Sequence, residues 1–126
     1  MVFEHFALNV ADIKKRVGWF VTHLGLKVVV AKEKAPFMTF LADSTDRVIM
    51  ELYQKEEEPL SNFKERQPAT FHIAFVSDDA EADKQRLMTE GATFVEEVKR
   101  EDGTHLVMLR DPWGMPLQLC ERPIKF

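Results

Sequence analysis

Short stretches of alternating apolar and polar residues, separated by turns, make up most of this chain. Residues 2–10 are the first such stretch and predict a strand, because successive side chains of a strand point to opposite faces. Asp12 follows as a candidate helix N-cap, and Gly25 stands where a left-handed residue would end that helix. Between them, apolar residues recur at helical spacing at Ile13, Val17, Phe20 and Leu24. The N-terminal pattern therefore predicts a strand followed by a helix.

The same order of elements is predicted twice along the chain. In the first half the helix is followed by strands expected over 26–31, 37–42 and 48–53. In the second half we expect a helix capped by Asp78 or Asp79 and ending near Gly91. The strands expected there cover 71–76, 93–98, 104–109 and 117–121. Each half is thus β-α-β-β-β, and two such modules side by side would form an α+β fold, a curved mixed sheet cup with helices outside.

The two halves also share residues at a constant offset. His5 and His72 are 67 positions apart (72 − 5), and so are Asp12 and Asp79. Glu51, inside Met-Glu-Leu, has the same offset from Gln118, inside Leu-Gln-Leu. A constant offset of this kind indicates an internal duplication.

A chain of 126 residues is long enough for one compact domain built from two small modules. We therefore expect a single domain over 1–126, with module one at about 1–54 and module two at about 71–126. The polar, charged stretch over 55–70 is the expected connection between them, and its three consecutive glutamates are interpreted as a solvated charge run.

Charge and cysteine content narrow the class of protein. The net charge is −4 and basic residues form no cluster, which argues against nucleic acid and anionic membranes as partners. No apolar run is long enough to span a bilayer, and no signal segment is visible. The single cysteine excludes an intrachain disulfide, so a cytoplasmic location is expected.

The repeated polar residues are suited to metal binding. His5 and His72 each share a strand face with a small alanine two positions later, which leaves room in front of the imidazole ring. Glu51 and Gln118 each stand inside an apolar strand, where a polar group is costly unless it has a partner. Two imidazoles, a carboxylate and an amide oxygen make a mixed nitrogen and oxygen site for a divalent cation.

Other polar residues have simpler interpretations. His23 falls in the last turn of the first helix and is expected at the surface. His105 follows a turn and either lines the cup or is structural. Cys120 shares a strand face with Gln118, and a buried inert thiol is its default interpretation.

The order of motifs resembles the glyoxalase/bleomycin-resistance/extradiol-dioxygenase family, also called the vicinal oxygen chelate family. The resemblance covers nearly the whole chain. It is carried by His5 in the first strand and by LGLKVV at 24–29, HIAFVSDD at 72–79, DGTHLVMLRDPWG at 102–114 and PLQLCE at 116–121. It implies paired βαβββ modules, a divalent metal that binds two adjacent oxygens of a small substrate, and a homodimer that completes the sites.

Within that family the chain is most similar to bacterial glyoxalase I, the lactoylglutathione lyase. The resemblance implies metal ligands at His5, Glu51, His72 and Gln118, with Glu51 as the catalytic base and with Ni, Zn, Co, Fe or Mn as the metal. Gln118 departs from the glyoxalase pattern, which has a glutamate there. Glu121 also follows in the motif, but strand alternation points it away from the Gln118 face.

Two classes of function follow. The first is a metal-dependent glyoxalase-like lyase or isomerase. The second is a binding protein without turnover that sequesters a small ligand or antibiotic, as bleomycin-resistance proteins do. A dioxygenase fits less well, because the family's iron enzymes take a carboxylate from the last strand, where this chain has Gln118. An epimerase also fits less well, because epimerase-like members of the family have their glutamine in the first half.

Overall fold

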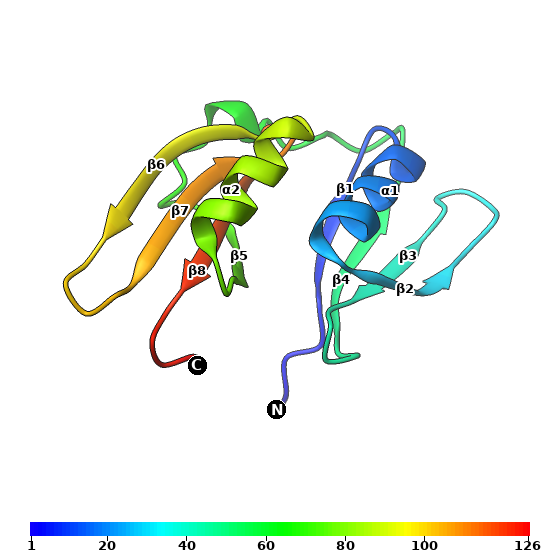
Figure 1. The fold of residues 1–126 in the computed structure, drawn as a ribbon. Helices are drawn as coiled ribbons and strands as arrows, with labels where there is room; N and C mark the ends of the chain where they lie inside the picture. Colours follow the sequence, from blue (N-terminus) through cyan, green and yellow to red (C-terminus); the bar gives the residue numbers. More distant parts are fainter. The chain divides into compact units, whose positions relative to one another are not determined.

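The computed structural model describes residues 1–126 and contains two compact units, Met1–Ser61 and Asn62–Phe126 (Figure 1). Each unit has one α-helix and one four-stranded mixed sheet, so the predicted pair of βαβββ modules is confirmed. The joining of the two sheets into one cup, and the single domain over 1–126, remain predictions.

Unit 1 is a sheet in the order β1-β4-β3-β2, with β1 parallel to β4 and the other pairs antiparallel. Its elements are β1 (Phe6–Asn9), α1 (Ile13–Leu24), β2 (Lys27–Ala31), β3 (Thr39–Ala42) and β4 (Val48–Tyr53).

Unit 2 repeats this topology with the order β5-β8-β7-β6 and one parallel pair, β5 with β8. Its elements are the 3-10 turn η1 (Phe63–Glu65), β5 (Ile73–Val76), α2 (Ala80–Thr89), β6 (Thr93–Lys99), β7 (His105–Arg110) and β8 (Pro116–Glu121).

The helices begin where the sequence predicts. Asp12 Oδ1 accepts a hydrogen bond from Lys15 N at 3.0 Å, which satisfies a free amide of the first turn of α1. Asp79, rather than Asp78, caps α2 by accepting from Ala82 N at 2.9 Å. Gly25 ends α1 with φ 69°, a left-handed conformation that costs glycine little.

One face of each sheet is buried beneath its helix. In unit 1 the fully buried residues of this face are Leu41, Met50 and Leu52, with Phe20 contributed by α1. In unit 2 the corresponding residues are Val107, Leu109 and Leu117, with Leu87 from α2. Because strand side chains alternate, the other face of each sheet presents the intervening residues, among them Glu51 and Gln118.

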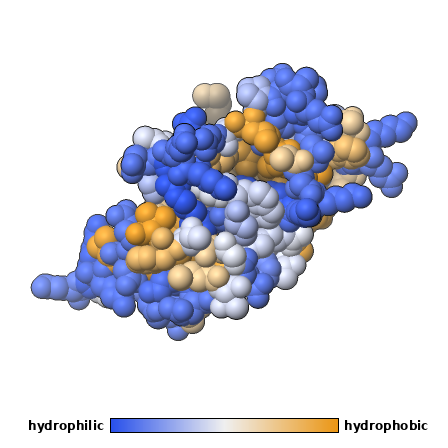
Figure 2. All heavy atoms as spheres, turned by 90° about the horizontal axis from the view of Figure 1, so that it is seen from above, coloured by the Kyte–Doolittle hydropathy of each residue, from blue (hydrophilic) through white to orange (hydrophobic).

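The edge strands are more exposed than the sequence suggests. Every residue of β2 and of β6 is exposed, including Val28, Val29 and Val30. The pairing of β2 with β3 shifts register between Val28 and Val30, which marks a β-bulge. On the face seen in Figure 2, apolar atoms gather in separate patches within a largely hydrophilic surface.

No helix of the protein combines the length and hydropathy needed to cross a membrane.

Candidate functional site

The first half of the predicted site is assembled within unit 1. His5 lies directly before β1 rather than inside it, and its Nε2 is 3.2 Å from Glu51 Oε2 on β4. The parallel register that pairs Ala7 with Glu51 brings these two side chains to the same sheet face. The His5 ring also meets the Phe40 ring edge to face, with 5.3 Å between centroids. The imidazole is therefore held on the open face, beside a carboxylate.

The other nitrogen of His5 faces a second carboxylate. Glu4 Oε2 lies 2.7 Å from His5 Nδ1, although the approach lies outside hydrogen-bond geometry. Both ring nitrogens of His5 therefore face a carboxylate, Nδ1 that of Glu4 and Nε2 that of Glu51. A metal bound at Nε2 requires the proton on Nδ1.

The second half of the predicted site lies in unit 2, in the same strand relationship. Ala74 pairs with Gln118 in parallel register, as Ala7 pairs with Glu51 in unit 1. His72 lies directly before β5, and its Nδ1 is 2.8 Å from the carbonyl oxygen of Pro68. A carbonyl can only accept, so Nδ1 donates and Nε2 carries the free lone pair. His72 is thus oriented to offer Nε2, whereas each ring nitrogen of His5 faces a carboxylate.

Gln118 opens onto a pocket of unit 2. The pocket has a volume of about 300 Å³ and is lined in part by Ala74, Val76 and Cys120, with Arg122 and Lys125 among its polar residues. The Cys120 thiol donates to Gln118 Oε1 at 3.4 Å. The amide oxygen that would bind a metal therefore already has one weak donor.

Each unit offers two donor groups of the kind that bind divalent metals. Each unit supplies one imidazole nitrogen and one side-chain oxygen: His5 with Glu51, and His72 with Gln118. Nitrogen and oxygen donors of this kind suit first-row divalent cations. The coming together of the two halves at one ion remains a prediction.

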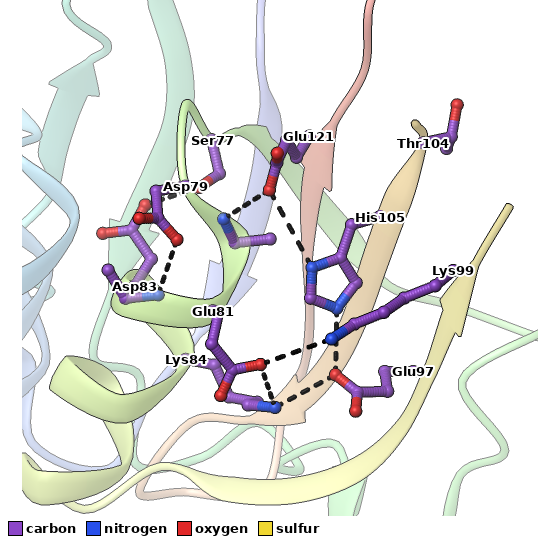
Figure 3. Close-up of polar contacts among 12 residues, drawn as sticks. Ser77, Asp79, Glu81, Asp83, Lys84, Glu97, Lys99, Thr104, His105 and Glu121 are labelled. Carbon is purple, nitrogen blue, oxygen red and sulfur yellow. Dashed lines mark hydrogen bonds and ion pairs between the residues drawn. The ribbon is translucent and has the colours of Figure 1, made fainter. Parts of the chain in front are cut away.

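A polar cluster that the sequence analysis missed lies beneath α2 (Figure 3). Lys84 Nζ contacts Glu81 Oε2 at 2.7 Å and Glu97 Oε2 at 3.0 Å. His105 Nε2 contacts the same Glu97 oxygen at 2.9 Å, and His105 is only 7% exposed. His105 therefore lies on the helix-covered face of its sheet, which supports the structural interpretation over the one in which it lines the cup.

The same cluster has the composition of a cation site. Ligand atoms of Glu81, Glu97 and His105 lie within 4.8 Å of one another. The Lys84 ammonium already supplies a positive charge to both carboxylates, and these carboxylates raise the pKa of Lys84. We therefore interpret the cluster as an ion-pair network that attaches α2 to β6 and β7.

Glu121 completes this region from β8. Its Oε2 accepts a hydrogen bond from Ala80 N at 2.9 Å, at the first turn of α2, and lies 3.8 Å from His105 Nδ1. A carboxylate at a helix N-terminus is stabilising. The expectation that Glu121 points away from Gln118 is confirmed.

Acid should weaken this network in unit 2. Hydrogen bonds from His105 and then Lys84 lower the pKa of Glu97 from 4.5 to about 2. A lowered folded-state pKa contributes stability above about pH 4.5, and this stability is lost as the pH falls toward 2. Glu97→Gln should therefore lower the thermal midpoint at neutral pH and cost progressively less as the pH falls through this window.

The measurement is thermal unfolding by circular dichroism across this pH range. Glu96→Gln is the matched control, because Glu96 is exposed and its neighbouring strand position faces the opposite side of the sheet. A Glu97→Gln penalty that is unchanged across the window would contradict the pKa shift.

Comparison with known proteins identifies the family. A sequence profile of the Glyoxalase/Bleomycin resistance protein/Dioxygenase superfamily matches residues 2–119. The chain belongs to this superfamily, as the resemblance of its motifs implies. A comparison with curated proteins gave no significant match.

Solved structures share the fold at low sequence identity. Lactoylglutathione lyase from Agrobacterium tumefaciens is 19% identical with a TM-score of 0.63, over 95% of this chain and 92% of that chain. The fosfomycin resistance protein FosX from Listeria monocytogenes is 15% identical with a TM-score of 0.75, over 98% and 95%. TnmS3, an antibiotic binding protein from Streptomyces sp. CB03234, is 17% identical with a TM-score of 0.69, over 97% and 96%. One fold thus serves both enzymes and binding proteins.

Proposed function

We propose that this protein is a metal-dependent, glyoxalase I-like lyase or isomerase that acts on a small substrate with two adjacent oxygens. The observation that carries the proposal is the His5–Glu51 contact of 3.2 Å on the open face of unit 1. Support comes from the matching Ala74–Gln118 register of unit 2 and from the Nδ1–H of His72, which is held by a carbonyl.

In this proposal His5, Glu51, His72 and Gln118 hold the metal. A bound divalent ion such as Ni²⁺ or Zn²⁺ supplies stabilisation of negative charge on the substrate oxygens. Glu51 takes the proton from the carbon that bears the hydroxyl and returns it to the adjacent carbon that bears the carbonyl, while the hydroxyl proton passes from the first oxygen to the second. Gln118 cannot exchange a proton in this range, so the proposal assigns both transfers to Glu51.

The test combines metal content with turnover. Protein purified without chelator should contain close to one divalent metal ion per site, as measured by inductively coupled plasma mass spectrometry. The metal-loaded protein should isomerise the hemithioacetal of methylglyoxal and glutathione. Bound metal without turnover would reject the glyoxalase assignment, and no bound metal after loading with Ni²⁺, Zn²⁺, Co²⁺, Fe²⁺ or Mn²⁺ would reject the metal site itself.

A binding protein without turnover is the second candidate. Two features favour it. The Cys120 thiol already donates a hydrogen bond to Gln118 Oε1, and position 118 has an amide where a glyoxalase has a carboxylate. The antibiotic-binding relative TnmS3 shows that the fold serves such a role. Saturable binding of a bleomycin-type or similar antibiotic by a metal-free protein, together with no turnover, would support this candidate.

We also propose a homodimer, since a dimer often completes the sites in this family. The chain has a mass of 14.6 kDa, so light scattering at micromolar concentration should give about twice that value. A mass equal to one chain across the concentration range would overturn the dimer.

A further inference from the structure

Unit 1 contains a cavity on the sheet face opposite the His5–Glu51 pair. Its volume is about 500 Å³, within the range of small-molecule sites. Thr39 lines it and pairs with Leu52, on the helix-covered face, whereas Glu51 pairs with Phe40 on the other face. The cavity is bounded by α1 on one side and by β2, β3 and the loop between them on the other. Its apolar wall includes Ile13, Val17, Val28, Ala31 and Phe37.

Gly18 keeps the helix side of this cavity open. A Cβ built at Gly18 would meet no heavy atom within 4 Å, so no close backbone approach requires a glycine there. Glycine inside a helix is less favourable than alanine. The residue therefore adds empty volume at the cavity and offers no packing in return.

Phe37 closes the other side in an unusual conformation. Its φ is 58°, in the left-handed region that a bulky residue rarely adopts. Hydrogen bonds hold the loop in place, from Phe37 N to Lys34 O at 2.8 Å and from Thr39 Oγ1 to Phe37 O at 3.0 Å. Strained residues held by their surroundings cluster at ligand sites. Here the strain places an aromatic ring at the wall of a cavity.

The charges at the cavity favour an anion. Lys14 and Lys32 line it, and neither side chain has an ion-pair partner in this structure. Glu33 is the one acidic residue among the lining residues, so they carry a formal charge of +1 (two Lys, one Glu) in a chain whose net charge is −4. Lysine stems lie along apolar surface while their ammonium groups reach solvent. A ligand whose apolar part lies in the cavity would thus have an acidic head group beside the ammonium groups of Lys14 and Lys32.

We propose that this cavity binds a small amphipathic monoanion, of the class of a medium-chain fatty acid. Its apolar chain lies between α1 and the β2–β3 hairpin, and its carboxylate lies at Lys14 and Lys32. The site is separate from the metal site of the proposed function, because none of His5, Glu51, His72 and Gln118 lines it.

The test is calorimetric titration of metal-free protein with decanoate and with decanol, which share the chain and differ in charge. Decanoate should bind at one site per chain, at least about ten-fold tighter than decanol. The double variant Lys14→Gln/Lys32→Gln should lose most of this preference and should still bind decanol. Glu33→Gln should tighten decanoate binding, because it removes the opposing charge.

Substitutions at Gly18 test whether the ligand occupies the cavity itself. Gly18→Leu should fill the cavity and weaken binding of both ligands at least about ten-fold, whereas Gly18→Ala should keep binding and raise helix stability. Amide chemical shifts of α1 and the β2–β3 hairpin should move with decanoate in the wild-type protein. Equal binding of decanoate and decanol would overturn the anionic specificity. Binding that survives Gly18→Leu in a folded protein, or no binding at all, would overturn the site.

Discussion

Replacing Glu51 by glutamine should reduce hemithioacetal turnover by about 10²–10⁴-fold, the usual contribution of a positioned general base. Glutamine keeps the size of the side chain but cannot accept the proton, and it removes the negative charge 3.2 Å from His5 Nε2. The measurement is kcat/KM with saturating metal, so that a weaker metal site does not by itself account for the loss.

Glu57→Gln is the control for this experiment. Glu57 is an exposed carboxylate in the polar segment after β4, and its loss changes the net charge by the same amount. It should leave turnover unchanged. A Glu51→Gln protein that binds metal and retains the wild-type kcat/KM would show that Glu51 is not the base.

Replacing Gln118 by glutamate should strengthen binding of Ni²⁺ or Zn²⁺ by about ten-fold or more. The change puts a charged donor in place of a neutral one in a partly desolvated pocket, where attraction between charges exceeds its value in water. A ten-fold gain corresponds to roughly 1.4 kcal/mol, a modest demand on such a contact. The two side chains are similar in size, so packing around Leu117 and Leu119 should be preserved. Calorimetric titration of both proteins measures the difference.

Gln67→Glu is the control that separates the effect of a carboxylate in the pocket from the effect of one more negative charge on the protein. Gln67 is exposed, and its replacement lowers the formal net charge from −4 by the same single unit, without placing a carboxylate in the pocket. Its metal affinity should match the wild type. Equal or weaker metal binding by Gln118→Glu would remove Gln118 from the site.

Local chemistry explains why much of the fold could be predicted. Asp12 and Gly25 mark the ends of α1, because a side-chain acceptor and a left-handed glycine act within one turn of the helix. The strand over Val48–Tyr53 has the bounds predicted from its run of apolar residues. The ends that depend on pairing were less accurate, since His5 and His72 precede β1 and β5 instead of lying within them. A strand ends where its ladder of hydrogen bonds ends, so its bounds depend on the partner strand as well as on its own sequence.

The same reasoning separates the predicted site residues from the missed ones. The repeat offset marked His5 and Glu51 as candidates through their counterparts His72 and Gln118. The structure places the His5 and Glu51 side chains in contact. The ion-pair network beneath α2 was missed because it joins a helix to a hairpin across the fold. The strand pairing does bring part of the network together. Lys99 pairs with His105 across the hairpin, and strand alternation puts Glu97 on the same sheet face as both. Cavity volume and the backbone conformation of Phe37 have no comparable signal in the sequence.

The bulge in β2 bears on the solubility of the protein. An edge strand with three consecutive exposed valines offers unpaired backbone groups on an apolar ribbon, which is a template for intermolecular strand addition. The register shift between Val28 and Val30 bends and twists this ribbon, and Lys27 and Lys32 place like charges at its ends. Deleting one valine to straighten β2 should therefore increase the tendency of this edge to pair with strands of other chains.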